Sequence, residues 1–362
     1  MKHVALWLLL LVPGAAAVHY LLHVRPLWTF VAGVAAIVPL AEWIRRGTEQ
    51  ISHRAGAAVG GLLNATFGNT AELVLAIFVL LTGQADVVKA QITGSIIGNG
   101  LLGFGLAIAI GTWGKQELGF KRERASLLSS LLMLVVIALL VPALFNYTER
   151  GIFASTEAAP LDEKLSLCVA VVLIVVYAAN LVYTLVTDRD VFAPDEPREQ
   201  KGEPWPLRRS IAVLVGATIA TAWMAQLVSG ALGATARTIG VSTFFLGVIV
   251  LAIIGNVAEY VSSIYFARQG RLALVAAITV GSTIQVALLV APILVLVSHV
   301  AGHPMNLVFD NPLELIAIAS VAFVVNAITR DGQATWFEGV LLIAVYVLLA
   351  FAFFFATPPS SA

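Results

Sequence analysis

Two glutamates in this 362-residue chain lie where a membrane interior would make them chemically significant. Glu72 and Glu259 each end a Gly-Asn-x-x-Glu pattern, at residues 68–72 and 255–259. Each is the only charged residue in its long apolar stretch. A carboxylate near the middle of a bilayer costs about 2.5–3.5 kcal/mol. Without a basic residue in its own stretch, such an acid is expected to bind a cation, to hold a proton, or to alternate between the two.

An asparagine and a glycine accompany each glutamate. Residues three or four apart share one face of a helix. Asn69 should therefore point the same way as Glu72, and Asn256 the same way as Glu259. A glycine before each asparagine lets another backbone approach, or lets the helix unwind and present carbonyl oxygens. These glycines are Gly68 and Gly255.

A Gly-Ser dipeptide follows each glutamate at the same distance in sequence. Ser95 lies as far beyond Glu72 as Ser282 lies beyond Glu259. Helical spacing puts Asn99 on the face of Ser95, and Gln285 on the face of Ser282. Both pairs would offer neutral oxygen ligands. For the small residues of these segments taken alone, close helix packing is the simpler explanation. Those residues are Gly94, Ser95, Gly98 and Gly281.

Carboxylate, amide, hydroxyl and carbonyl oxygens together suit a hard cation. Ca²⁺ takes six to eight such ligands in flexible geometry, whereas Mg²⁺ demands a tighter arrangement and is less favoured. Protons compete for the same carboxylates. The pattern therefore predicts a cation/proton exchanger in which Glu72 and Glu259 bind the metal ion and the protons.

The bulk composition is that of an integral membrane protein. Hydrophobic residues make up 59% and charged residues 12%, and the mean hydropathy is +0.94. A helix needs about 20 apolar residues to span a bilayer. The charge-poor segments predict an all-α protein with eleven transmembrane helices. They lie near 4–22, 27–44, 56–81, 88–112, 125–146, 164–186, 209–230, 239–267, 272–299, 312–329 and 334–357.

The two motif sets are separated by one constant offset in sequence, which indicates an internal duplication. This repeat offset relates Glu72 to Glu259, and the same offset relates Ser95 to Ser282. Repeat one would occupy residues 25–187 and repeat two residues 208–362, after one extra N-terminal helix at 1–24. Five spans per repeat is an odd number, so the second repeat would be inverted. Inverted repeats that enclose an ion site are typical of secondary transporters.

The distribution of basic residues predicts the orientation. If the chain crosses eleven times, 16 of the 21 Lys and Arg residues fall on the side of the N-terminus. The positive-inside rule then places the N-terminus in the cytoplasm and the C-terminus outside. The N-terminal segment also has features of a cleavable signal peptide, which would leave ten spans. Without an organelle-targeting segment, a prokaryotic inner membrane is expected.

The polar segment 188–207 is predicted to be a cytoplasmic linker between the repeats. Its six acids could bind calcium weakly, although a solvated connector is the simpler explanation. Glu314 and Glu338, near span ends, are expected to reach water. The single Cys168 excludes an internal disulfide and a cysteine metal cage. We expect no cofactor and no nucleic-acid partner, with Ca²⁺ as cargo; the sequence does not indicate the oligomeric state.

Other functions fit the sequence less well. A sodium-coupled calcium exchanger, or a Na⁺(K⁺)/H⁺ antiporter, could use the same fold. An intramembrane hydrolase is disfavoured, because the chain has no HExxH, no Gly-x-Ser-x-Gly and no pair of intramembrane aspartates. We therefore expect no enzyme activity. A purely structural scaffold would have no need for buried acids.

At these motifs the chain resembles the calcium/proton antiporters of the cation exchanger family, within the calcium/cation antiporter superfamily. The likeness covers nearly the whole chain. It is strongest at residues 61–72, 94–99, 255–259, 281–285 and 331–339. The paired Gly-Asn-x-x-Glu patterns, each followed by Gly-Ser, are highly specific to this family.

The resemblance implies eleven helices, two inverted five-helix repeats and a central site where Ca²⁺ and protons compete for Glu72 and Glu259. It also implies cation ligation by amide oxygens, with two serines nearby. Those residues are Asn69, Asn256, Asn99, Gln285, Ser95 and Ser282. The chain departs from the family pattern at Gly98, where a serine is usual, and at Thr335, where an asparagine is usual.

Overall fold

The computed structural model describes residues 7–22, 25–114, 118–119, 122–149, 155–187, 205–309, 311–330 and 332–356. In these ranges the regular structure is helical apart from one antiparallel pair of two-residue strands. The strands are β1 (Leu118–Gly119) and β2 (Gln333–Ala334). The prediction of an all-α fold is therefore confirmed for the part of the chain that the structure describes.

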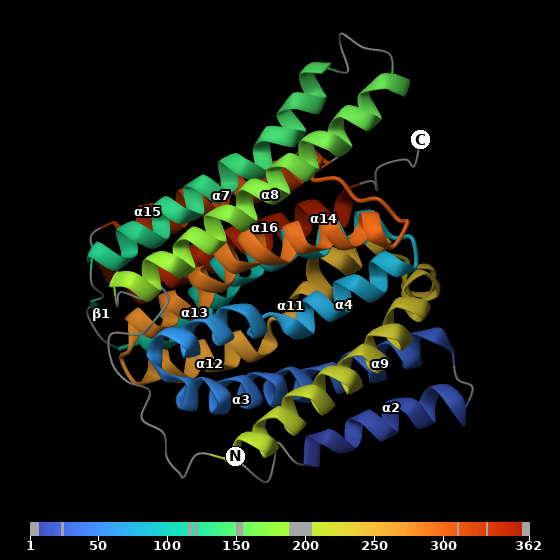
Figure 1. Ribbon diagram of the computed structural model, residues 1–362, viewed down its shortest axis with the longest axis horizontal. Coiled ribbons are helices and arrows are strands. Elements are labelled where there is room, and N and C mark those ends of the chain that lie inside the picture. The colour runs from blue at the N-terminus through green and yellow to red at the C-terminus, as the bar shows by residue number, and fades with distance from the viewer. Residues whose placement is uncertain are drawn as a thin grey trace. The chain divides into compact units, whose positions relative to one another are not determined.

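The longer helices appear in Figure 1, coloured along the chain. In chain order the α-helices are α2 (Leu11–Tyr20), α3 (Pro26–Phe67), α4 (Thr70–Leu81), α5 (Ala85–Ile97), α6 (Phe104–Gly111), α7 (Arg122–Glu149), α8 (Ser155–Thr187), α9 (Leu207–Ile239), α10 (Thr243–Phe245), α11 (Ala252–Gly255), α12 (Val257–Arg268), α13 (Leu272–Gln285), α14 (Ala291–Val300), α15 (Pro312–Thr329) and α16 (Trp336–Phe355). A 3₁₀ turn covers Leu8–Leu10, and π-helical segments cover Gly98–Gly103, Leu246–Leu251 and Val286–Val290.

Eight of the described helices are long and apolar enough to cross a membrane. A ninth results if Thr243–Gly255 and Val257–Arg268, which are interrupted at Asn256, form one span. The segments Leu8–Tyr20 and Thr70–Leu81 are apolar but shorter. The predicted third span, 56–81, is divided between the end of α3 and α4. A membrane protein is thus supported, while the count of eleven stays a prediction.

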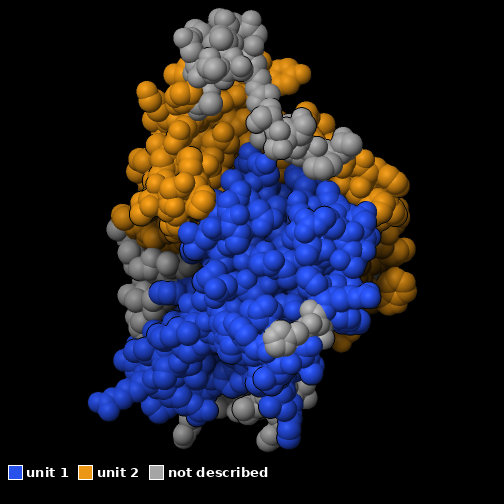
Figure 2. All heavy atoms as spheres, turned by 90° about the vertical axis from the view of Figure 1, so that its right-hand side faces the viewer, with its two compact units in different colours: residues 1–91, 199–258 blue, residues 92–198, 259–362 orange. Residues whose placement is uncertain are grey.

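The chain forms two compact units, each built from two stretches of sequence (Figure 2). Unit 1 contains residues 1–91 and 199–258, and unit 2 contains residues 92–198 and 259–362. Each unit therefore takes helices from both halves of the sequence. The chain passes from unit 1 to unit 2 within α5, and again at the start of α12.

In unit 1, α3 and α9 make the most extensive packing of any two elements (Figure 1). Two glycines of α3 allow the close approach. A Cβ on Gly33 would lie 2.8 Å from Val228 Cγ2, and one on Gly47 would lie 3.1 Å from Leu214 Cβ. The contact positions rise along α3 and fall along α9, so the two helices run antiparallel.

Two stacked tryptophan rings join one end of the α3–α9 pair. The rings of Trp43 and Trp205 stack with centroids 6.0 Å apart. Arg46 lies 5.5 Å from the ring centre of Trp43, and Arg209 lies 4.7 Å from that of Trp205. Each arginine thus lies over the tryptophan of its own segment, and the stack of Trp43 on Trp205 is the contact that joins the start of α9 to α3.

In unit 2, α16 packs mainly along α6, and α15 along α7. The closest approach is at Gly339, where a Cβ would lie within 3.0 Å of the Ala109 backbone nitrogen. Thr335 begins α16 with a capping box, in which its hydroxyl and the Glu338 carboxylate bond to each other's backbone N–H groups. The departure from the family pattern at Thr335 therefore supplies a good helix N-cap.

Several helix boundaries recur at the repeat offset that separates Glu72 from Glu259. α4 and α12 begin at Thr70 and Val257 and end at Leu81 and Arg268. The tight turns that follow contain Gly83 at φ 77° and Gly270 at φ 76°. Two π-helical segments, 98–103 and 286–290, also correspond within one residue at their starts. The duplication seen in the sequence thus has a counterpart in local backbone structure.

The packing at Gly339 makes a prediction about stability. Gly339→Ala should lower the melting temperature of the detergent-purified protein, because overpacking against backbone atoms costs about 1–3 kcal/mol. Gly216→Ala is the matched control, since nothing lies within 4 Å of a Cβ at that α9 position. Alanine is also the better helix former there by up to about 1 kcal/mol. Equal melting temperatures for the two variants would contradict this account of the packing.

Candidate functional site

Glu72 lies in the first turn of α4, in unit 1. Gly68 and Asn69 separate α3 from α4, and both residue types are poor in helix interiors. The interruption gives α4 its own N-terminus, whose partial positive charge favours a carboxylate in the first turn. Glu72 is only 2% exposed, so the helix end places an acid inside the protein.

Asn256 is a side-chain partner of Glu72 within unit 1. Its amide nitrogen Nδ2 donates to Glu72 Oε1 at 3.3 Å and to the Ala252 carbonyl at 2.8 Å. Asn256 lies at the break between α11 and α12, the counterpart of the break beside Glu72. Gly255 faces the glutamate, because a Cβ there would lie 3.5 Å from both Cβ and Cγ of Glu72. The structure therefore brings together the glutamate of one motif and the Gly-Asn of the other.

Gln91 is a third neighbour that the sequence analysis missed. It is buried in α5, and its Nε2 donates to the backbone carbonyl of Glu72 at 3.3 Å. The sequence feature that could have revealed Gln91 is its neutral amide in an apolar stretch, one helical turn before Ser95. This bond ties α5 to the first turn of α4 and so helps to position Glu72.

In unit 2, the corresponding polar contact joins the two Gly-Ser segments. Asn99 Nδ2 donates to Ser282 Oγ at 3.1 Å, and both residues are buried. Asn99 lies in the π-helical segment after α5, and Ser282 lies in α13. Two of the predicted oxygen ligands thus lie within hydrogen-bond distance of each other.

Glu259 occupies the first turn of α12, in unit 2, and is partly exposed rather than buried. One of the two motif glutamates therefore belongs to each unit. The other predicted site residues are mostly buried: Asn69, Ser95, Gln285, Gly94 and Gly281 are buried, and Gly68 is partly exposed. Within the described ranges, no three His, Cys, Asp or Glu side chains come together as a metal site.

Glu314 does not reach water, and that expectation was wrong. It is 2% exposed, in the first turn of α15, where its Oε1 accepts a hydrogen bond of 3.0 Å from the Thr93 hydroxyl. The helix N-terminus and this hydroxyl stabilise a carboxylate inside unit 2. Glu338, partly exposed, is held in the capping box of α16.

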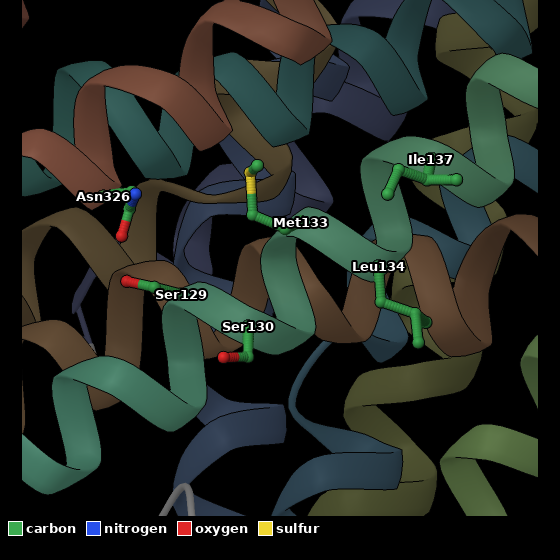
Figure 3. A pocket seen from close by; sticks show the side chains of 6 residues that line it. All are labelled: Ser129, Ser130, Met133, Leu134, Ile137 and Asn326. Carbon is green, nitrogen blue, oxygen red and sulfur yellow. The ribbon is translucent and has the colours of Figure 1, made fainter.

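Two surface grooves have linings that include none of these residues. One groove of about 580 Å³ runs between α7 and α15 (Figure 3). Its lining is Ser129, Ser130, Met133, Leu134, Ile137 and Asn326, with no carboxylate. Another, of about 740 Å³, lies in unit 1 beside α2, α4 and α9 and also has no acidic lining residue. Neither groove includes a predicted site residue.

Long apolar helices interrupted beside intramembrane acids are typical of secondary ion transporters. The chain belongs to the sodium/calcium exchanger protein family, whose model matches residues 25–186 and 209–355. It is therefore an integral membrane protein of a transporter family, and the family resemblance inferred from the motifs is confirmed.

Two relatives that are similar in sequence are both described as Ca(2+)/H(+) antiporters. The chain is 38% identical to a Ca(2+)/H(+) antiporter of Aphanothece halophytica, covering 96% of this chain and 95% of that protein. It is 37% identical to the Ca(2+)/H(+) antiporter ChaA of Bacillus subtilis, covering 90% and 91%. The similarity thus extends over nearly the full length of each relative.

Solved structures agree with the sequence comparison. The chain superimposes on native YfkE with a TM-score of 0.81 and 32% identity, covering 95% of this chain and 97% of that one. It also matches the H+/Ca2+ exchanger CAX with a TM-score of 0.72 at 17% identity, covering 98% and 92%. The second match concerns the fold alone.

The Asn256–Glu72 contact makes a prediction about transport. Asn256→Leu should lower cation-driven proton flux by about tenfold or more, because a hydrogen bond to a charged group contributes about 1.5–3 kcal/mol. Flux is measured in liposomes containing the purified protein. Gln226→Leu makes the same amide-to-aliphatic change at an exposed α9 position and should keep its flux. Equal flux in the two variants would remove Asn256 from the site.

Proposed function

We propose that this protein is a Ca²⁺/H⁺ antiporter that exports Ca²⁺ from the cytoplasm in exchange for protons. The observation that carries the proposal is the buried Glu72 at a helix break, bonded to the Asn256 amide of the second motif. The descriptions of relatives that are similar over nearly their whole length support calcium as the cation. Sodium-coupled calcium exchange, or Na⁺(K⁺)/H⁺ exchange, is the alternative.

Glu72 and Glu259 are proposed to bind Ca²⁺ and protons in turn. A nearby divalent cation favours the ionised form of a carboxylate, and a bound proton removes the charge that attracts the cation. Ca²⁺ and H⁺ therefore exclude each other from the same oxygens. This competition couples the two ion movements without any covalent step.

Neutral oxygens are proposed to complete the coordination of Ca²⁺. Amide and hydroxyl oxygens provide flexible, uncharged ligands, which suit an ion that must be released as well as bound. The proposed ligands are Asn69, Asn256, Asn99, Gln285, Ser95 and Ser282. The glycines Gly68, Gly255, Gly94 and Gly281 would allow close helix approach around them. Ca²⁺ is the cargo, and no resident cofactor is proposed.

The proposed architecture is one N-terminal helix, 1–24, followed by inverted five-helix repeats at 25–187 and 208–362. The recurrence of helix boundaries, tight turns and π-helical segments at the repeat offset supports this arrangement. The basic residues favour a cytoplasmic N-terminus, a cytoplasmic linker at 188–207 and an external C-terminus. A prokaryotic inner membrane is the proposed location.

Transport is proposed to follow alternating access. From the cytoplasmic side, the two glutamates release protons and bind one Ca²⁺. A rearrangement of helices then opens the site outward, where protons displace the cation and reset the carrier. Since each step changes the charge on the glutamates, neither ion can complete the cycle alone.

The choice of ion is tested in liposomes with an acidic interior and a pH-sensitive dye. Ca²⁺ added outside should release protons from the lumen, whereas Na⁺ or K⁺ alone should not. Proton release by Na⁺ or K⁺ would favour the monovalent alternative. No proton release with any cation, combined with sodium-driven Ca²⁺ uptake, would favour sodium-coupled exchange.

The two glutamates are tested by Glu72→Gln and Glu259→Gln. Each change removes the charge and keeps nearly the same shape, so the variants should insert normally. Ca²⁺-driven proton release should fall to the level of empty liposomes. Asp86→Asn is the control, since the Asp86 side chain is 59% exposed and outside the proposed site. Full exchange by either glutamine variant would disprove the assignment of that glutamate.

A further inference from the structure

Two glycines at the ends of one π-helical segment form a notch that holds the side chain of Tyr260. All three residues belong to unit 2. A Cβ on Gly98 would lie within 3.0 Å of the Tyr260 hydroxyl oxygen. A Cβ on Gly103 would lie 2.7 Å from Cδ1 and 2.8 Å from Cε1 of the same ring. The tyrosine therefore fills space that any larger residue at either position would occupy.

The π-helical geometry of Gly98–Gly103 is what aligns the two glycines. Residues five apart in a regular α-helix, with 3.6 residues per turn, point in widely different directions. A π-helical segment bonds residue i to residue i+5 and so places them one above the other. In agreement, a Cβ on Gly103 would lie 3.5 Å from the Gly98 carbonyl oxygen. The notch therefore depends on two features: the two glycines, and the wider π-helical turn that aligns them.

The notch brings α12, which carries Glu259, into contact with the π-helical segment that carries Asn99. Tyr260 follows Glu259 directly in the first turn of α12, and Gly98 directly precedes Asn99. Tyr260 is only 6% exposed, so its ring is fixed in the interior. Because neighbouring residues on a helix differ by a constant rotation, seating Tyr260 fixes the direction in which Glu259 leaves α12.

We propose that Tyr260, seated between Gly98 and Gly103, is a positioning residue that sets the orientation of Glu259 relative to the segment carrying Asn99. The proposal rests on the proposed function, in which Glu259 binds Ca²⁺ and protons. The ring, seated against Gly103, provides the positioning, and the glycine at 98 leaves room for its hydroxyl. Replacing or displacing the ring should therefore alter Ca²⁺ binding rather than only stability.

The glycine pair and the tyrosine are not repeated at the equivalent positions of the sequence. At the repeat offset, Gly98 and Gly103 correspond to Gln285 and Val290, and Tyr260 corresponds to Leu73. Glu72 is buried and bonded to Asn256, while Glu259 is partly exposed. The two glutamates thus have different described surroundings, and the residue after Glu72 is a leucine rather than a tyrosine.

The first test measures the apparent KM for Ca²⁺ and the pH profile of transport in liposomes. Tyr260→Ala empties the notch and should raise KM by about tenfold or more, because a misplacement of about 1 Å can cost up to ~100-fold. Its pH profile should shift as well. Tyr260→Phe keeps the ring and should remain close to the wild type. A lower melting temperature for Tyr260→Ala, with KM and pH profile unchanged, would overturn the proposal.

The second test uses rescue at the two glycines. Gly98→Ala should raise KM because its methyl group meets the Tyr260 hydroxyl. Adding Tyr260→Phe should restore KM, since the nearest remaining ring atom, Cζ, lies 3.7 Å from that Cβ. Gly103→Ala meets ring carbons, so Tyr260→Phe should not rescue it. Failure of rescue at Gly98, or equal rescue at both glycines, would contradict the geometry.

These outcomes are separable from a failure of the proposed function. If wild-type protein showed no Ca²⁺-driven proton release, the Ca²⁺/H⁺ assignment would fail, and the same variants would be measured with the cation that is transported. If the wild type exchanges Ca²⁺ for H⁺ and Tyr260→Ala matches it in KM and pH profile, only the positioning role fails.

Discussion

The low tolerance of a membrane interior for charge is the constraint on which the rest of the structure depends. A carboxylate there is costly unless a cation, a proton or oriented dipoles stabilise it. The Glu72 and Glu259 stretches contain no Lys or Arg, and each glutamate lies in the first turn of a helix that begins at an interruption. The helix breaks therefore do more than bend the chain. They give each glutamate a helix N-terminus, and at the break beside α12 they bring the Asn256 amide to Glu72.

Glycine, asparagine and π-helical turns together create this polar interior in an otherwise apolar fold. The Gly-Asn pairs end one helix and begin the next, so Asn256 can reach Glu72. The π-helical turn after α5 carries Asn99 to Ser282, and the same turn aligns Gly98 with Gly103. The helix breaks and the π-helical turn both interrupt regular α-helix geometry. Each places a polar or aromatic side chain near a motif glutamate or near a Gly-Ser segment.

Much of this organisation could be predicted from sequence, because the motifs carry it locally. The Gly-Asn-x-x-Glu patterns predicted two equivalent acidic positions, and their spacing predicted the correspondence between α4 and α12. Contacts between distant residues could not be predicted. The bond from Gln91 to Glu72 and that from Thr93 to Glu314 depend on how separate helices pack. The notch for Tyr260 also depends on a π-helical turn, which hydrophobic periodicity does not reveal.

The central claim is that Ca²⁺ and protons compete for the same carboxylates. Calorimetry of Ca²⁺ binding, in buffers that differ in ionisation enthalpy and across a range of pH, tests it most directly. If the claim holds, Ca²⁺ binding releases protons, its affinity rises with pH as the glutamates lose protons, and Glu72→Gln reduces the number released. Ca²⁺ binding of unchanged affinity across that range, with no proton release, would contradict it.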